Sequence, residues 1–269
     1  MIHKPFKSDS MNLSLLNKTA VICGSTQGIG LATAIILSGL GANCILIARN
    51  QQSLINALKK LSISEGQQHA YEVADFSDPA SVGAAIQKIV SQQQVEILVN
   101  NSGGPQPAPI TTALSIDFEQ AFSQHLICNH LLVNAVLPGM KKTGYGRIIN
   151  IISTSVKTPL PNLGVSNTIR AAVAAWAKTL ANEVGQYNIT VNNVLPGLTN
   201  TMRYTKLLDS LSATTNKAEA EQALIDTIPM KRIGTPEEIG NVIAFLASPA
   251  ASYVTGTSIR ADGGRTPSI

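Results

Sequence analysis

The chain contains few charged, aromatic or cysteine residues. Only 13% of its 269 residues are charged and 4% are aromatic, whereas 44% are hydrophobic. This composition excludes an intrinsically disordered chain, and so little charge indicates that part of the surface is buried in an oligomer. The net charge of +4 comes from scattered Lys and Arg residues. No basic cluster marks a nucleic-acid-binding surface, so we expect a globular protein with no nucleic-acid partner.

Metal-ligand patterns and long apolar runs are also missing. The three cysteines, Cys23, Cys44 and Cys128, form no CxxC motif, and the four histidines show no metal-ligand spacing. We expect reduced core thiols, no metal site and a cytoplasmic protein. The apolar runs are too short to span a bilayer, so we expect no membrane association. Residues 1–14 lack a signal-peptide core and are predicted to be a mobile N-terminal extension before a single domain, residues 15–269.

Strand-like and helical runs alternate from Lys18 onward. Several expected strands are continuous Val- and Ile-rich runs, which is typical of a parallel sheet covered on both faces. The alternation predicts an α/β fold, a single doubly wound Rossmann-fold domain in which a seven-stranded parallel sheet has helices on both faces. The expected strands are 19–23, 44–47, 69–73, 95–99, 147–151, 190–194 and 258–261, and the expected helices are 29–40, 52–61, 79–92, 117–140, 166–184 and 236–246.

The expected helices 117–140 and 166–184 carry apolar or small residues on more than one face. A helix that is apolar on several sides is buried on several sides. The sheet covers one side, and either a second subunit or the body of one thick domain covers the other. We expect a homo-oligomer, a dimer or tetramer, that forms through these two helices.

The most informative stretch is Gly24-Ser25-Thr26-Gln27-Gly28-Ile29-Gly30. It follows the first expected strand and opens the first expected helix. Glycines allow a sharp turn and the close approach of a pyrophosphate, and the helix start offers free N–H groups to an anion. The position of the turn, more than the three glycines, predicts a dinucleotide site rather than an ordinary strand-to-helix turn.

Motifs along the chain resemble those of the short-chain dehydrogenase/reductases, most nearly the 3-oxoacyl carrier-protein reductases. The resemblance runs from about Leu15 to Gly264 and rests on Gly24-x-x-x-Gly28-Ile29-Gly30, Asp75, Asn100–Gly103, Asn150, Ser153, Pro196-Gly197 and Asp262–Gly264. It implies an oxidoreductase with a nicotinamide cofactor and a small carbonyl or alcohol substrate. It also implies that Asp75 and Phe76 frame the adenine, that Asn101, Ser102 and Gly103 lie along the adenosine and phosphates, and that Thr201 meets the nicotinamide amide.

The second expected strand ends in Ile47-Ala48-Arg49-Asn50. NAD sites usually place an acid here for the ribose 2′-hydroxyl, whereas a cation suits a 2′-phosphate. Arg49 therefore favours NADP(H), with NAD(H) possible. Two observations temper this preference: many NADP-using relatives have a second basic residue at the position of Gln27, and Arg49 could instead be a solvated loop charge.

The resemblance breaks at the catalytic residues. The family uses Asn, Ser, Tyr and Lys, and these positions fall on His125, Ser153, Ser166 and Arg170, so only the serine is retained. An aliphatic hydroxyl is a far weaker acid than a phenol and is shorter by a ring, so Ser166 substitutes poorly for the tyrosine. Arg170 keeps the positive charge but cannot relay a proton, because it stays protonated.

The proton donor is therefore open between His125, Tyr204 and water. Imidazole can act near neutral pH, but His125 could equally be a packed helix residue that is hydrogen-bonded to backbone. Tyr204 lies in the expected substrate lid, residues 199–228, whose polar stretch 210–221 is expected to be mobile.

Three functions remain open. The first is an NADP(H)-dependent oxidoreductase with non-standard proton donation. The second is a nucleotide-binding sensor or structural subunit with little or no dehydrogenase activity. The third, a dehalogenase-like enzyme, fits least, since the similar halohydrin dehalogenases keep the tyrosine and lack the glycine pattern.

Overall fold

The computed structural model describes residues 11–212 and 216–268. Their strands form one parallel sheet in the order β3-β2-β1-β4-β5-β6-β7, which confirms the predicted doubly wound, seven-stranded arrangement. The strand bounds are β1 Thr19–Cys23, β2 Asn43–Ala48, β3 Ala70–Val73, β4 Ile97–Asn100, β5 Gly146–Ile151, β6 Ile189–Pro196 and β7 Ser258–Ala261.

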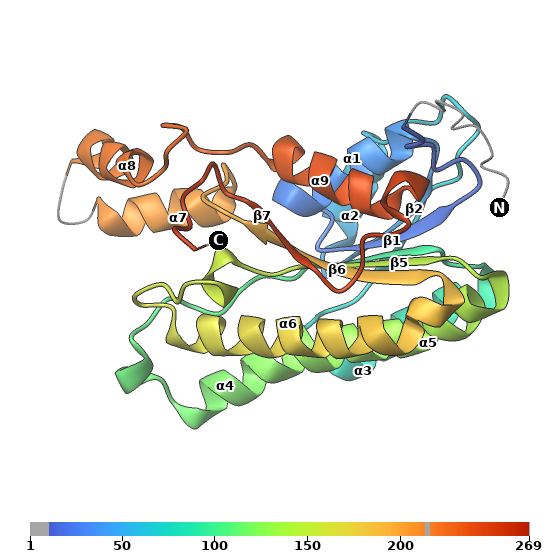
Figure 1. Cartoon of the computed structure of the whole chain (residues 1–269), viewed down its shortest axis with the longest axis horizontal. Coiled ribbons are helices and arrows are strands. Elements are labelled where there is room, and N and C mark those ends of the chain that lie inside the picture. Colours follow the sequence, from blue (N-terminus) through green and yellow to red (C-terminus); the bar gives the residue numbers. More distant parts are fainter. Residues whose placement is uncertain (1–10, 213–215, 269) are drawn as a thin grey trace, which may run out of the picture.

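Helices cover both faces of the sheet and enclose two apolar cores (Figure 1). On one face, Leu37 and Ile243 pack against β1, β2 and β4. On the other, Ile86, Leu132 and Ala177 pack beneath the same strands. The helix bounds are α1 Gly28–Gly39, α2 Gln51–Leu58, α3 Pro79–Gln92, α4 Ser115–Phe122, α5 Cys128–Thr143, α6 Gly164–Val184, α7 Met202–Leu211, α8 Lys217–Asp226 and α9 Pro236–Ala247.

Chain order reverses between β1 and β4. The chain winds outward to β2 and β3 on one side and to β5, β6 and β7 on the other. A crevice therefore forms at the carboxyl ends of β1 and β4, where the helical connections diverge. The glycine turn after β1 and the segment after β4 border this crevice.

The expected helix 117–140 is divided by a π-helical segment, η2 Ser123–Ile127, between α4 and α5. Here the N–H of Cys128 donates to the carbonyl of Ser123, one residue further back than in an α-helix. Single π turns inside helices occur frequently at functional sites. His125 lies within this π-helical segment.

The expected lid contains two helices, α7 and α8, at one end of the molecule (Figure 1). Residues 213–215 of the stretch expected to be mobile lie outside the described residues, but α8 begins at Lys217. The N-terminal extension falls largely outside them as well. Where it is described it is attached, since Ala250 N–H donates to the Asn12 carbonyl at 3.1 Å and Leu15 is fully buried.

Candidate active site

The glycine turn depends on the absence of side chains. Gly24 and Gly28 have φ angles of +58° and +54°, which L side chains rarely adopt. A Cβ on Gly30 would collide with the carbonyl oxygen of Gly24, and one on Gly28 would lie 3.2 Å from Cγ2 of Thr201. Thr201 is thus directly beside the turn.

At the start of α1, the N–H groups of Gly28, Ile29 and Gly30 make no hydrogen bond to any residue that the structure describes. The N-cap Gln27 makes no side-chain capping hydrogen bond, and the first turn carries no acidic residue. Free N–H groups and the positive end of the helix dipole suit a phosphate. The residues present therefore fit the pyrophosphate of a dinucleotide.

Several predicted cofactor residues use their side chains to hold the loops in place. Asn101 Nδ2 donates to the carbonyls of Cys23 and Gly24, both at 3.3 Å, and so fixes the turn to the end of β4. The Ser25 hydroxyl donates to Ile47 O at 3.4 Å, and Asn50 Oδ1 caps α2. Contact between these residues and a nucleotide would involve mainly their backbone atoms.

The Phe76 side chain is not placed to frame an adenine, so any contact of this residue with the cofactor would use its backbone. Its ring belongs to the core beneath the sheet and is 8% exposed, because Val82 and Ile86 of α3 pack in the same cluster. Asp75 keeps its carboxylate at the crevice. Its pKa is lowered by the hydrogen bonds from Ser77 and by the charge of Arg49.

Arg49 is exposed at the end of β2. None of the ion pairs among residues 11–212 and 216–268 includes it. Its effect on Asp75 shows that its charge reaches the region of the expected adenosine. A guanidinium that is free at this position can fork onto a ribose phosphate.

Three of the four predicted catalytic positions lie on α6 and the segment before it. Ser153 Oγ accepts from Ser155 N–H at 3.1 Å, which leaves the serine proton free to donate to a substrate oxygen. Ser166 and Arg170 are buried on α6. Arg170 Nη1 donates to Ile151 O at 3.0 Å, which ties α6 to the end of β5. Burial and the nearby Arg203 lower the pKa of Arg170 to about 10, so it still carries its charge at neutral pH.

His125, the fourth position, is neutral and buried. Burial, together with the charges of Arg170 and Arg203, lowers its pKa to about 2. Its Nδ1 lies 2.8 Å from Ser102 Oγ, so its partner is a side chain and not the expected backbone carbonyl. Its Nε2 is buried without a partner among the described residues. His125 is therefore no imidazolium acid at neutral pH, which corrects one of the predicted proton donors.

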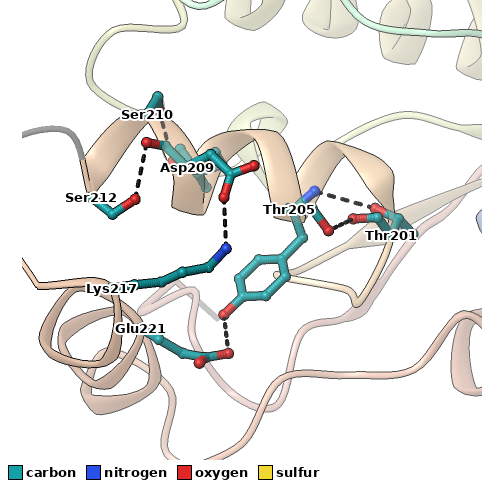
Figure 2. A network of polar contacts seen from close by, with 9 residues as sticks. Thr201, Thr205, Asp209, Ser210, Ser212, Lys217 and Glu221 are labelled. Carbon is teal, nitrogen blue, oxygen red and sulfur yellow. Dashed lines mark hydrogen bonds and ion pairs between the residues drawn. The ribbon is translucent and has the colours of Figure 1, made fainter.

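The Tyr204 hydroxyl is hydrogen-bonded within the lid. It donates to Glu221 Oε1 at 2.9 Å, and burial and Glu221 raise its pKa to about 12. Figure 2 shows Glu221 and Lys217 reaching from α8 to α7, where Lys217 pairs with Asp209 at 2.7 Å. These contacts join the two lid helices and leave Tyr204 poorly suited to protonate a substrate.

Two features escaped sequence reasoning. Arg203, in the first turn of α7, contacts the crevice: its Nη2 donates to Pro105 O at 3.5 Å, and a Cβ on Gly104 would collide with its guanidinium. Below the crevice, Asn100, Asn150 and Asn193 form a buried hydrogen-bonded row across β4, β5 and β6. The position of Arg203, two residues after Thr201, is a sequence signal that could have identified it.

The family model described as enoyl-(acyl carrier protein) reductase matches residues 24–266. NADPH-dependent reductase BacG of Bacillus subtilis is 32% identical over 256 residues, which is 94% of this chain and 99% of the relative. The 3-oxoacyl-[acyl-carrier-protein] reductase FabG of Pseudomonas aeruginosa is 35% identical over 256 residues, 94% of this chain and 98% of the relative. The solved L-sorbose reductase of Gluconobacter frateurii, in complex with NADPH and L-sorbose, is 32% identical with a TM-score of 0.91, covering 96% of this chain and 100% of that one.

The chain belongs to the short-chain dehydrogenase/reductase family. The 3-oxoacyl carrier-protein reductase resemblance inferred from its motifs is confirmed. Among the residues described, no helix is long and apolar enough to cross a membrane, and no group of three or more His, Cys, Asp or Glu side chains is arranged for a metal ion.

Proposed function

We propose that this protein is an NADP(H)-dependent oxidoreductase that acts on a carbonyl or alcohol substrate through a modified catalytic set. The observation that carries the proposal is the meeting of an anion-binding glycine turn with Ser153, Ser166 and Arg170 at one edge of the sheet. BacG is described as NADPH-dependent, and the L-sorbose reductase was solved with NADPH, so similar proteins use this cofactor.

The cofactor would lie across the crevice. The N–H groups at the start of α1 would hold the pyrophosphate, and Arg49 would hold the ribose 2′-phosphate. Thr201, which lies beside Gly28, would contact the nicotinamide end. The end of β2 carries Arg49 and not the acidic residue that binds the ribose 2′-hydroxyl in NAD sites. This difference supports NADP(H) over NAD(H).

When bound, NADPH supplies a hydride to the substrate carbonyl carbon. Ser153 is positioned to donate a hydrogen bond to the oxygen as negative charge develops there. Arg170 carries a fixed positive charge that stabilises the same oxygen. Because Arg170 stays protonated, it contributes charge but no proton.

Water is the proposed proton source. His125 is neutral, and the Tyr204 hydroxyl is bonded to Glu221. The Ser166 hydroxyl is no stronger an acid than water, and its burial on α6 limits proton exchange with the solvent. A water molecule would give a proton to the alkoxide, and the hydroxide that remains would take a proton from the solvent.

The test compares NADPH oxidation by the wild-type protein and its Ser153→Ala variant, on a panel of ketones and oxoacyl thioesters. We expect wild-type turnover and a loss of about 100-fold or more in kcat for the variant. The double variant S166Y/R170K should raise kcat, because it restores the family's proton donor. Tight NADPH binding with no turnover on the panel, in the wild type and the double variant alike, would instead favour a cofactor-binding sensor or structural subunit.

The homo-oligomer and the cytoplasmic location belong to the same proposal. Exposed Ala171 and Ala175 on α6, and Phe122 at 42% exposure on α4, support contact with a second copy across this face. The three cysteines are free and buried, which suits a reducing compartment.

A further inference from the structure

We infer that the substrate carries an anionic oxygen group, a carboxylate or a phosphate, which Arg203 and Arg170 bind together beside the reacting carbonyl. This inference rests on the proposed reductase function and names the class of its substrate. It comes from two positive charges that no carboxylate of the described residues balances.

The two arginines reach the same region from different elements. Arg203 extends from the first turn of α7 over Gly104 to the Pro105 carbonyl. Arg170 extends from α6 to the Ile151 carbonyl at the end of β5. Each lies close enough to His125 to lower its pKa, and Arg203 does the same to Arg170. The geometry agrees: Ser102, the hydrogen-bond partner of His125, is two residues before Gly104, which the Arg203 guanidinium covers, and the π segment that carries His125 packs against α6.

No carboxylate among residues 11–212 and 216–268 pairs with either arginine. The ion pairs there involve Lys88, Lys217, Lys231 and Arg232, all with other partners. Glu221, the acid on the facing lid helix, accepts from Tyr204. Arg170 is buried at 8% exposure, and a buried guanidinium without a counter-ion is costly, whereas Arg203 is on the exposed side of the same region. The structure therefore favours a ligand that supplies the missing negative charge.

A third polar group in this region also lacks a partner. His125 is 1% exposed, and its Nε2 makes no hydrogen bond to a described residue. If the Ser102 hydroxyl donates to Nδ1, Nε2 carries the proton and can donate to an anionic oxygen. Two guanidinium groups and one imidazole would then surround a single anionic group.

The cofactor's own phosphates do not account for these donors. The start of α1 is suited to the pyrophosphate, and exposed Arg49 at the end of β2 is suited to the 2′-phosphate. Arg203 and Arg170 lie on α7 and α6, near the segment after β5 that presents Ser153. An anion bound there is attached to the substrate, close to its carbonyl group.

Calorimetric titration of the NADP⁺-loaded protein tests this with two matched pairs of carbonyl compounds. Phenylpyruvate is compared with phenylacetone, which lacks the carboxylate. Dihydroxyacetone phosphate is compared with dihydroxyacetone, which lacks the phosphate. We expect at least one anion to bind about 10- to 100-fold more tightly than its neutral partner, and the pair that responds distinguishes carboxylate from phosphate. High salt should weaken the anion selectively.

The Arg203→Ala variant should lose this preference and keep its affinity for NADP⁺. Lys206→Ala, an exposed cation on the same helix, is the matched control and should retain the preference. If both anions bind no better than their neutral partners, the inference is wrong. If the anionic ketones are reduced with unchanged kcat/KM in Arg203→Ala, the anion site fails while the reductase stands. If anions bind through Arg203 but no carbonyl compound is reduced, the reductase function fails and the anion site stands.

Discussion

Arg170 and Ser166 separate two tasks that the family's catalytic helix combines. In the family, a lysine and a tyrosine on this helix stabilise charge and transfer a proton. Here Arg170 supplies charge in a forked geometry and stays protonated, while Ser166 offers only a weakly acidic hydroxyl. In the proposed reaction, this residue pair would keep the electrostatic stabilisation, and solvent would supply the proton.

His125 makes stability depend on pH. Its pKa is 6.5 when unperturbed and about 2 in the folded protein, so below 6.5 the unfolded state binds more protons than the folded state. The free energy of unfolding therefore falls as pH decreases from 6.5, by up to about 1.4 kcal/mol per pH unit from this group. Denaturant titrations of the wild type and His125→Asn, at pH values from neutral down to about 5, should show a shallower decline in the variant.

His130→Asn is the control for that measurement. His130 is exposed on α5 and bonded to Asn134, so its loss should leave the wild-type pH slope in place. Parallel declines in His125→Asn and the wild type would contradict the neutral, buried state of His125.

At the residue scale, motif positions were predictable and pairings were not. Gly24, Gly28 and Gly30 could be recognised from the sequence, because a Cβ at these positions would be strained or would collide with neighbouring atoms. The sequence does not reveal that His125 meets Ser102, because that contact joins segments 23 residues apart. Nor does it show that Phe76 points into the core, since that depends on where α3 packs.

The parallel strands β4, β5 and β6 share a row of buried amides that should contribute strongly to stability. Asn150 donates to Asn193 at 3.0 Å and accepts from Asn100 at 2.8 Å, and it is fully buried. Asn150→Ala breaks both bonds and leaves two neighbours unsatisfied, so unfolding free energy should fall by about 2–4 kcal/mol. Chemical denaturation checks this, with exposed Asn134→Ala expected to change it by less than about 0.5 kcal/mol. A similarly small effect in Asn150→Ala would show that the row contributes little.

The lid helices give a second prediction at this scale. Tyr204→Phe removes the bond to Glu221 and should increase amide hydrogen exchange in α8. It should also preserve NADPH turnover within about twofold, because the hydroxyl belongs to the lid and not to the chemistry. Tyr253→Phe, at a fully exposed position, is the control and should change neither quantity. A large fall in kcat for Tyr204→Phe, with kcat unchanged in Tyr253→Phe, would contradict this expectation and make Tyr204 a candidate proton donor.

Element boundaries follow the strength of the local signals. α3 has the predicted bounds because Asp78 caps it and Pro79 opens it. The lid helices were missed because α8 is short and polar, and α7 buries only Tyr204 and Leu208 against its neighbours. The π turn at His125 was equally out of reach, since this segment packs against α6, which is distant from it in the sequence.

At the scale of the whole molecule, the low content of charged residues favours a surface with few charges that a second subunit covers. The core on this side of the sheet buries one side of α5 and α6, and α4 packs on α6 through Ala121, while Ala171 and Ala175 of α6 remain exposed. Small residues let another helix approach closely, and nearby Phe122, at 42% exposure, adds apolar area. A second copy of the chain placed on this face would bury a surface that has few charges to desolvate.

Ala175→Arg tests that arrangement. Arginine is a good helix former, so in a monomer the exposed substitution should barely affect stability. In an oligomer it would place an unpaired charge in the interface and should shift the mass, measured by light scattering, toward the monomer. Ala218→Arg makes the same change on the exposed surface of α8 and should leave the mass unaltered. If both variants keep the wild-type mass, α6 lies outside any interface, and the low charge of this face is a property of the monomer alone.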